Sequence, residues 1–85
     1  METRQWLIIS AFRYALGRRT YISSTMSEYL LQNTNLLSVD NKQLIINEIK
    51  VKLKLNELGD ECDKSNWLEV LDHYIENIIW EDTNK

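Results

Sequence analysis

The chain has 85 residues, enough for one domain with one modest core, and its 44% hydrophobic and 27% charged residues exclude the disordered class of proteins. Its two glycines and the absence of proline leave little of the turn chemistry that hairpins and β-sandwiches need, so we expect an all-α fold. The net charge of −3 conceals an asymmetry: residues 1–20 carry four arginines against one acid, whereas residues 59–82 carry eight acids against one lysine.

The first predicted helix covers residues 3–16. Apolar residues recur along it at intervals of three and four, and we expect most of them on one broad face: Trp6, Leu7, Ile9, Phe12, Ala15 and Leu16, with Ile8 and Ala11 filling in. Gly17 follows directly and is expected to end the helix in the left-handed conformation. The acid at Glu2 and the interruption of the apolar run by Arg13 argue against a signal peptide and a bilayer span, so we expect a soluble, cytoplasmic protein.

The second predicted helix is short and opens within the segment SSTMSE. Thr25 followed three residues later by Glu28 matches a capping box, which predicts that the helix starts there. The polar residues 32–35, QNTN, are expected to form a loop.

Residues 38–58 admit two interpretations. Residues 49–55 alternate apolar side chains with lysines, which is strand periodicity, but as a helix the segment has two opposed apolar stripes that neighbours on both sides would cover. Lys, Leu and Glu are good helix formers, Glu48 stands four residues before Lys52, and no second strand is available to pair with. We therefore favour a helix that ends before Gly59, with the strand as the alternative.

The last predicted helix is the most clearly amphipathic. Asp63 is expected as its N-cap, and apolar residues follow at intervals of three and four: Trp67, Leu68, Leu71, Tyr74, Ile75, Ile78 and Ile79. We expect Trp67 and Tyr74 in the core, Trp80 partly exposed, and the tail 81–85 frayed. These segments predict a small four-helix single domain over residues 1–85.

No residue pattern indicates an enzyme, a metal site or a bound cofactor. The single histidine, His73, and the single cysteine, Cys62, lie on or just before the last helix, and we expect a surface imidazole and a buried, unreactive thiol. The acidic run at 60–63 lacks the alternating oxygen ligands and central glycine of a calcium loop. We therefore expect a non-enzymatic protein.

Two charged surfaces are candidates for binding a partner. The predicted acidic surface consists of Asp60, Glu61, Asp63, Glu69, Asp72, Glu76 and Trp80, and it suits a groove built for a phosphate backbone. The alternative basic site consists of Arg13, Arg18, Arg19 and Tyr21, which with Tyr14 can hold phosphate and stack a base. Each also has a simpler interpretation, a solvated face for the first and a helix end paired with the acidic half of the chain for the second.

The segments AFRYALGRRTYISSTMSEYL, LIINEIK and GDECDKSNWLEVL resemble those of small proteins encoded by bacteriophages and prophages. The resemblance covers most of the chain and implies origin more than activity. It suggests an accessory protein of the kind that inhibits host nuclease-based defence, as anti-CRISPR proteins do.

The expected function is therefore binding to a host or phage protein. More specifically, we expect the protein to inhibit a nucleic-acid-handling defence complex such as CRISPR-Cas through its acidic last helix. The alternative is a small nucleic-acid-binding or regulatory protein that uses the basic site. The sequence leaves the partner, the pathway and the oligomeric state open.

Overall fold

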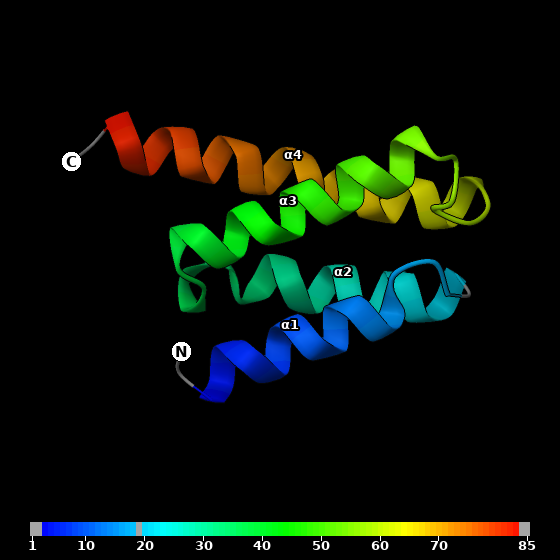
Figure 1. Cartoon of the computed structure of the whole chain (residues 1–85), viewed down its shortest axis with the longest axis horizontal. Helices are drawn as coiled ribbons and strands as arrows, with labels where there is room; N and C mark the ends of the chain where they lie inside the picture. Colours follow the sequence, from blue (N-terminus) through cyan, green and yellow to red (C-terminus); the bar gives the residue numbers. More distant parts are fainter. Residues whose placement is uncertain (1–2, 19, 84–85) are drawn as a thin grey trace.

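The computed structural model describes residues 3–18 and 20–83, and nearly all of them lie in helices (Figure 1). The elements are α1 (Thr3–Ala15), α2 (Thr20–Gln32), the 3₁₀ turn η1 (Thr34–Leu36), α3 (Val39–Lys54) and α4 (Glu61–Thr83). The described residues contain no strand, so the prediction of an all-α, four-helix fold is confirmed.

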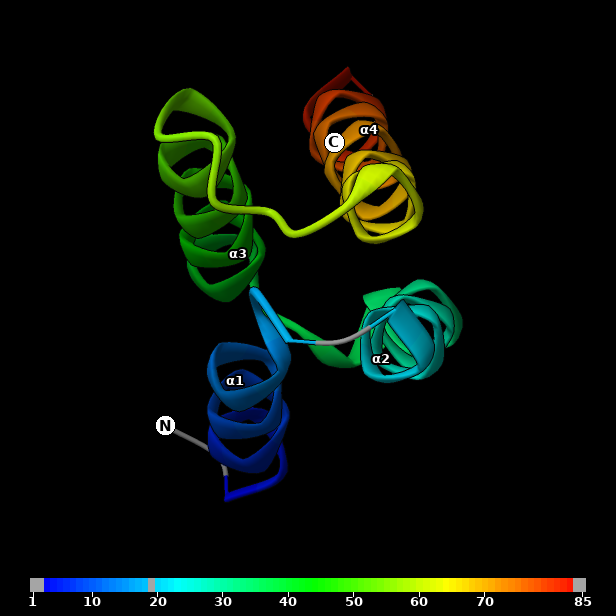
Figure 2. The ribbon, with the colours of Figure 1, turned by 90° about the vertical axis from the view of Figure 1, so that its right-hand side faces the viewer.

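The helices form two antiparallel hairpins, α1–α2 and α3–α4, laid one on the other (Figures 1 and 2). In the end-on view of Figure 2, α1 and α4 occupy opposite corners of a square, as do α2 and α3. α2 packs beside α4 and α1 beside α3, with the helices of each of these pairs running parallel. The link between the hairpins, residues 33–38, therefore crosses the end of the bundle diagonally.

The first helix ends where the sequence predicts, but the second starts earlier. Gly17 has φ = +83°, the left-handed conformation expected of a helix stop. α2 begins at Thr20, so the predicted capping box at Thr25 and Glu28 is wrong. The Thr25 hydroxyl instead donates to the carbonyl of Tyr21, 2.9 Å away, as threonines inside a helix do.

Residues 49–54 are helical, which settles the choice between strand and helix. Ser38 caps α3 by accepting a hydrogen bond from the Asn41 N–H. The helix ends at Lys54 and not at residue 58, because Asn56 adopts φ = 57° and the Glu57 N–H donates to the carbonyl of Lys52, which is a Schellman stop.

The two apolar stripes predicted for residues 38–58 are covered unequally, and in the second only Leu58 is buried and Leu44 partly buried. Ile45, Ile46 and Ile49 are buried, whereas Val51 and Leu55 are exposed. The expectation that neighbours pack on both sides of α3 was wrong, because α3 stands at a corner of the bundle and contacts helices on one side only.

The boundaries of α4 also differ from those predicted. The N-cap is Asp60, whose Oδ1 accepts from the Asp63 N–H at 3.0 Å while the Asp60 N–H donates to Asp63 Oδ2 at 3.2 Å. Asp63 was expected at the cap and lies instead in the first turn. The helix continues to Thr83, past the start of the expected fraying at residue 81, because Glu81 is held by Lys42 of α3. Residues 84–85 lie outside the described residues.

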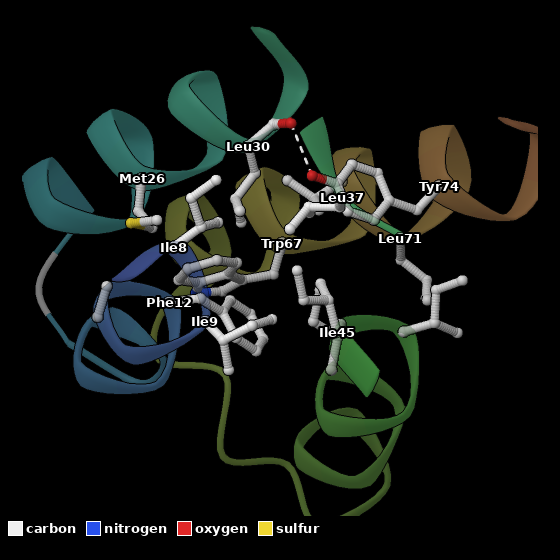
Figure 3. Close-up of a cluster of buried hydrophobic side chains, with 14 of the residues drawn as sticks. Ile8, Ile9, Phe12, Met26, Leu30, Leu37, Ile45, Trp67, Leu71 and Tyr74 are labelled. Atoms are coloured by element: carbon white, nitrogen blue, oxygen red, sulfur yellow. Dashed lines mark hydrogen bonds between the residues drawn. The ribbon is translucent and has the colours of Figure 1, made fainter. Parts of the chain in front are cut away.

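The core is built around Trp67 of α4, as Figure 3 shows. Its ring meets that of Phe12 edge to face, with the centroids 5.7 Å apart, which joins α4 to α1 across the bundle. The Trp67 indole N–H has no hydrogen-bond partner in the described part of the chain, so this side chain contributes through buried area. Trp67 and Tyr74 were expected in the core, and both are fully buried.

A second anchor joins α4 to α2. The Tyr74 hydroxyl donates to the carbonyl of Leu30 at 2.7 Å, the dashed line in Figure 3. Burial raises the pKa of the Tyr74 phenol well above its ordinary value, because the phenolate would lose its hydration; a hydrogen bond with Thr34 opposes this shift. Tyr74 therefore belongs to the packing of the fold, and its neutral form is the stabilising one.

Candidate interaction surfaces

Four carboxylates form an exposed stripe along the outer side of α4. They are Glu61, Glu69, Asp72 and Glu76, here called the acidic face. Spacings of three, four and eight residues bring them to the same side of the helix, away from the buried Trp67 and Tyr74. Within the part of the chain that the structure describes, none of the four takes part in a hydrogen bond or an ion pair. Their charge is therefore directed to solvent.

Asp63 does not belong to this face, although the sequence prediction included it. It is only 4% exposed, and its Oδ1 accepts a hydrogen bond from the Ser23 hydroxyl of α2 at 2.7 Å. The Asn66 amide donates in turn to Ser23 Oγ at 3.0 Å. Asp63 is therefore a buried link between α4 and α2, and Asp60, which is exposed, serves the helix as its N-cap.

The acidic face ends in an apolar patch near the C-terminal end of α4. Ile79 and Trp80 are 59% and 64% exposed, and Asp82, which lies one turn after Ile79, is also exposed. We call these three residues the C-terminal patch. The expectation that Trp80 is partly exposed is confirmed, and Ile79, expected on the apolar core side, lies outside instead. A large aromatic at the end of a charged stripe is a typical anchor for a protein partner.

The structure separates Arg13 from the other described residues of the predicted basic site: Arg18 and Tyr21 line one hollow, whereas Arg13 pairs with another helix. Arg13 lies near the end of α1 as expected, but its guanidinium pairs with Glu48 of α3 at 3.3 Å, not with the acidic half of the chain. Arg18 Nε donates to the Tyr14 carbonyl at 3.1 Å, and its guanidinium lies over the Tyr14 ring at 4.9 Å from the centroid. Among the described residues Arg18 has no carboxylate partner, so Arg18 does not make the expected pairing with the acidic half of the chain. Arg19 lies outside the described residues.

A groove between α1 and α2 was not predicted from the sequence. It has a volume of about 390 Å³ and is almost entirely apolar in lining: Ala11, Tyr14, Ala15, Tyr21, Ile22, Thr25, Met26 and Tyr29. A second hollow shares Tyr14, Tyr21 and Ile22 with this groove and is also lined by Gly17 and Arg18, so Arg18 stands at one end of the groove. We call it the tyrosine groove. The three tyrosines at spacings of seven and eight were the available signal, but separate helices carry them.

The residues considered for catalysis remain apart. Cys62 is exposed in the first turn of α4, which contradicts the expected buried thiol, and His73 is exposed as expected. Eleven residues separate them on one helix, about 16 Å along its axis, so they cannot form a nucleophile–base pair. The described residues contain no group of three potential metal ligands.

A buried lysine is the other feature that sequence reasoning missed. Lys42 of α3 is 1% exposed, and its ammonium donates to Asn77 Oδ1 at 2.7 Å and to Glu81 Oε1 at 3.0 Å, both on α4. A lysine in a polar stretch of sequence is ordinarily a surface residue, and nothing in the pattern distinguishes this one. Because Lys42 neutralises Glu81, the Glu81 carboxylate does not add to the negative charge that α4 presents to a partner.

Comparisons with known proteins give no match: no protein-family model, no curated protein and no solved structure is similar to this chain. None of the described helices combines the length and the apolar character that a bilayer crossing requires. The candidate function is accordingly argued from the surfaces of the bundle.

Proposed function

We propose that this protein is a non-enzymatic binding protein whose acidic face docks into a basic groove of a nucleic-acid-handling protein. The observation that carries the proposal is the set of Glu61, Glu69, Asp72 and Glu76, exposed on one side of α4 and making no ion pair with any described residue. Carboxylates repeated along a rigid helix present a line of negative charge, which is what a groove shaped for a phosphate backbone attracts.

The resemblance to phage-encoded proteins directs the proposal to a host defence complex such as a CRISPR-Cas nuclease. In that setting the acidic face excludes the nucleic acid from its groove, and Trp80 supplies an apolar anchor at the end of the contact. Long-range attraction between the two surfaces raises the association rate and makes it sensitive to salt, because the screening length is about 8 Å at physiological ionic strength.

The alternative, direct binding of nucleic acid through the arginines, has less support. Counterion release requires several cations on one surface, whereas Arg13 is paired with Glu48 and Arg18 lies against Tyr14. One ion-paired guanidinium and one stacked on a tyrosine ring, on a chain of net charge −3, are a small electrostatic footprint for nucleic acid.

The test is a quantitative pull-down from a nuclease-treated bacterial lysate with three tagged baits. They are the unmodified protein, the triple variant Glu69→Lys/Asp72→Lys/Glu76→Lys, and a control with the same charge change elsewhere, Glu28→Lys/Asp40→Lys/Glu57→Lys. We expect the unmodified protein and the control to retain the same nucleic-acid-handling protein, and the triple variant to lose it. Added DNA should compete for the captured protein.

Two results would count against the proposal. One is capture that the triple variant retains although circular dichroism shows all three baits to be equally helical. The other is tight, salt-sensitive binding of bare DNA or RNA by the unmodified protein in an electrophoretic mobility shift, which would favour the arginines instead.

A further inference from the structure

The tyrosine groove and the C-terminal patch are complementary surfaces of the same chain. The groove is apolar along its length and has the cation Arg18 at one end. The patch offers the apolar side chains Ile79 and Trp80, with the carboxylate of Glu76 one turn before Trp80 and that of Asp82 one turn after Ile79. An aromatic anchor beside carboxylates matches an apolar groove that ends in an arginine, both in polarity and in charge.

The two surfaces cannot meet within one molecule. The α1–α2 turn, which holds the Arg18 end of the groove, and the C-terminal end of α4 lie at opposite ends of the bundle (Figure 1). The bundle is 38 Å long, and α4 is a continuous helix to Thr83, so its end cannot fold back. Only another copy of the chain can bring this patch to the groove.

Both surfaces have large side chains that are mostly exposed to solvent. Tyr14 and Tyr21 are each 68% exposed, and Trp80 is 64% exposed. Arg18 uses its Nε for the Tyr14 carbonyl, and its terminal guanidinium nitrogens make no hydrogen bond within the described part of the chain. The two terminal nitrogens of the guanidinium can therefore donate hydrogen bonds to a carboxylate of another molecule.

We infer that this protein associates with itself head to tail, the C-terminal patch of one copy seated in the tyrosine groove of the next. The contact is heterologous, because each copy uses a different surface toward each neighbour, so it extends into a ring or a chain of copies. A contact of one helix end with one groove is small compared with the roughly 1,200 Å² of a stable interface, so we expect the association to be weak and reversible. The inference does not rest on the proposed function, although Trp80 is common to both contacts.

Sedimentation of the purified protein tests the inference, and the groove and the patch can be removed separately. At low ionic strength we expect the average mass to rise with concentration beyond that of a dimer. Trp80→Ala should lower the association constant roughly tenfold or more, as truncation of a central aromatic anchor does. Tyr21→Ala should do the same from the groove side, and Arg18→Glu, which leaves the apolar packing of the groove intact, should do so through charge. The control Val51→Ala/Leu55→Ala removes exposed apolar surface from α3, outside both surfaces, and should leave association unchanged.

Mixing the variants gives the decisive measurement. Trp80→Ala keeps its groove and Arg18→Glu keeps its patch, so an equimolar mixture retains one working contact and should form a dimer that does not grow further. A protein that stays monomeric at millimolar concentration and low salt would overturn the inference. So would association that persists in both variants, or a mixture that shows no more association than its components.

Discussion

Lys42 Nζ lies 3.0 Å from Glu81 Oε1, and this contact holds the last turns of α4 against the start of α3. The Lys42 side chain is 2% exposed, whereas that of Glu81 is 34% exposed, so the two partners differ in what they lose when the pair is broken. The lysine cannot reach water without opening the two helices, and the glutamate can.

Removal of the Glu81 side chain should therefore lower the free energy of unfolding more than removal of the Lys42 charge does. Glu81→Ala leaves a buried ammonium with Asn77 as its remaining partner, and we expect a loss of about 1–3 kcal/mol in the free energy of unfolding, less than for a fully buried pair. Lys42→Met keeps the shape of the side chain without the charge, and should cost less than about 1 kcal/mol. Urea unfolding of the two variants measures both values. The reverse order would mean that the lysine is stabilised by its own packing and hydrogen bond with Asn77.

The two glycines should respond differently to the same substitution. Gly17 and Gly59 both have positive φ, +83° and +92°, so alanine is strained at either position by about 1–2 kcal/mol. A Cβ at Gly17 would come no nearer than 3.5 Å to the Glu57 carbonyl oxygen, whereas at Gly59 it would lie 2.9 Å from Asp63 Cγ and nearer still to Asp63 Oδ2. Asp63 cannot move aside without breaking its bond with Ser23.

We therefore expect Gly59→Ala to cost at least about 1 kcal/mol more than Gly17→Ala, since overpacking adds to the backbone strain. Thermal unfolding of both variants, with Gly17→Ala as the matched control, tests this. Equal costs would show that the turn before α4 shifts freely and that Asp63 is not fixed in place.

Stability should fall in alkali through Tyr74. The fold raises the pKa of this phenol, and the unfolded chain ionises it near the ordinary value of about 10. Above that pH the unfolded state binds fewer protons than the folded state. The contribution of the neutral Tyr74 phenol to the free energy of unfolding is therefore complete below about pH 10 and declines as the pH rises further.

Tyr74→Phe is the control for this titration. It lacks the ionising group, so its stability should decline less steeply above about pH 10, although at neutral pH it should lose about 0.5–1.5 kcal/mol with the hydrogen bond to Leu30. The Thr34 hydroxyl still donates to that carbonyl at 3.2 Å, which limits the loss. Parallel alkaline slopes for the two proteins would contradict a phenol kept neutral by burial.

Neutralising the acidic face should stabilise the free protein while it removes binding. Glu69, Asp72 and Glu76 repel one another at spacings of three and four residues, at a cost of about 0.2–0.5 kcal/mol per pair. The triple variant Glu69→Gln/Asp72→Asn/Glu76→Gln should therefore unfold at a slightly higher urea concentration at low salt, and the difference should shrink in high salt. A less stable variant would reveal that these carboxylates support the fold.

Sequence reasoning was most successful where one physical signal dominated. The apolar period of α4 and its polar opposite side placed Trp67 and Tyr74 inside, and a glycine directly after an apolar run marked the end of α1. On α1 it was right only in part: Ile9, Phe12 and Ala15 are buried as expected, whereas Trp6 and Leu7 are exposed. That segment is apolar nearly all round, so its period does not decide which side faces the core.

Burial of polar residues was beyond the reach of the pattern. Lys42 and Asp63 are charged residues in charged surroundings, and only the packing of α4 on its neighbours places a partner beside each. The same limit explains why the sequence predicted one candidate surface and not the other. The acidic stripe follows from spacing along one helix, whereas the tyrosine groove requires the relative placement of two.

The diagonal link between the hairpins has a consequence for how the chain assembles. Each hairpin alone exposes apolar side chains that the other hairpin covers in the bundle. The hydrogen bond from Tyr74 of the second hairpin to Leu30 of the first joins residues that are 44 positions apart in the sequence. We therefore expect local helix pairing to come early and the meeting of the halves to come last. Residues 33–38 are the tether between the halves, and two of them, Thr34 and Leu37, are buried when the halves meet. Two peptides divided within that tether should recombine into a native-like complex, at a rate set by their concentration and no longer by the length of the loop.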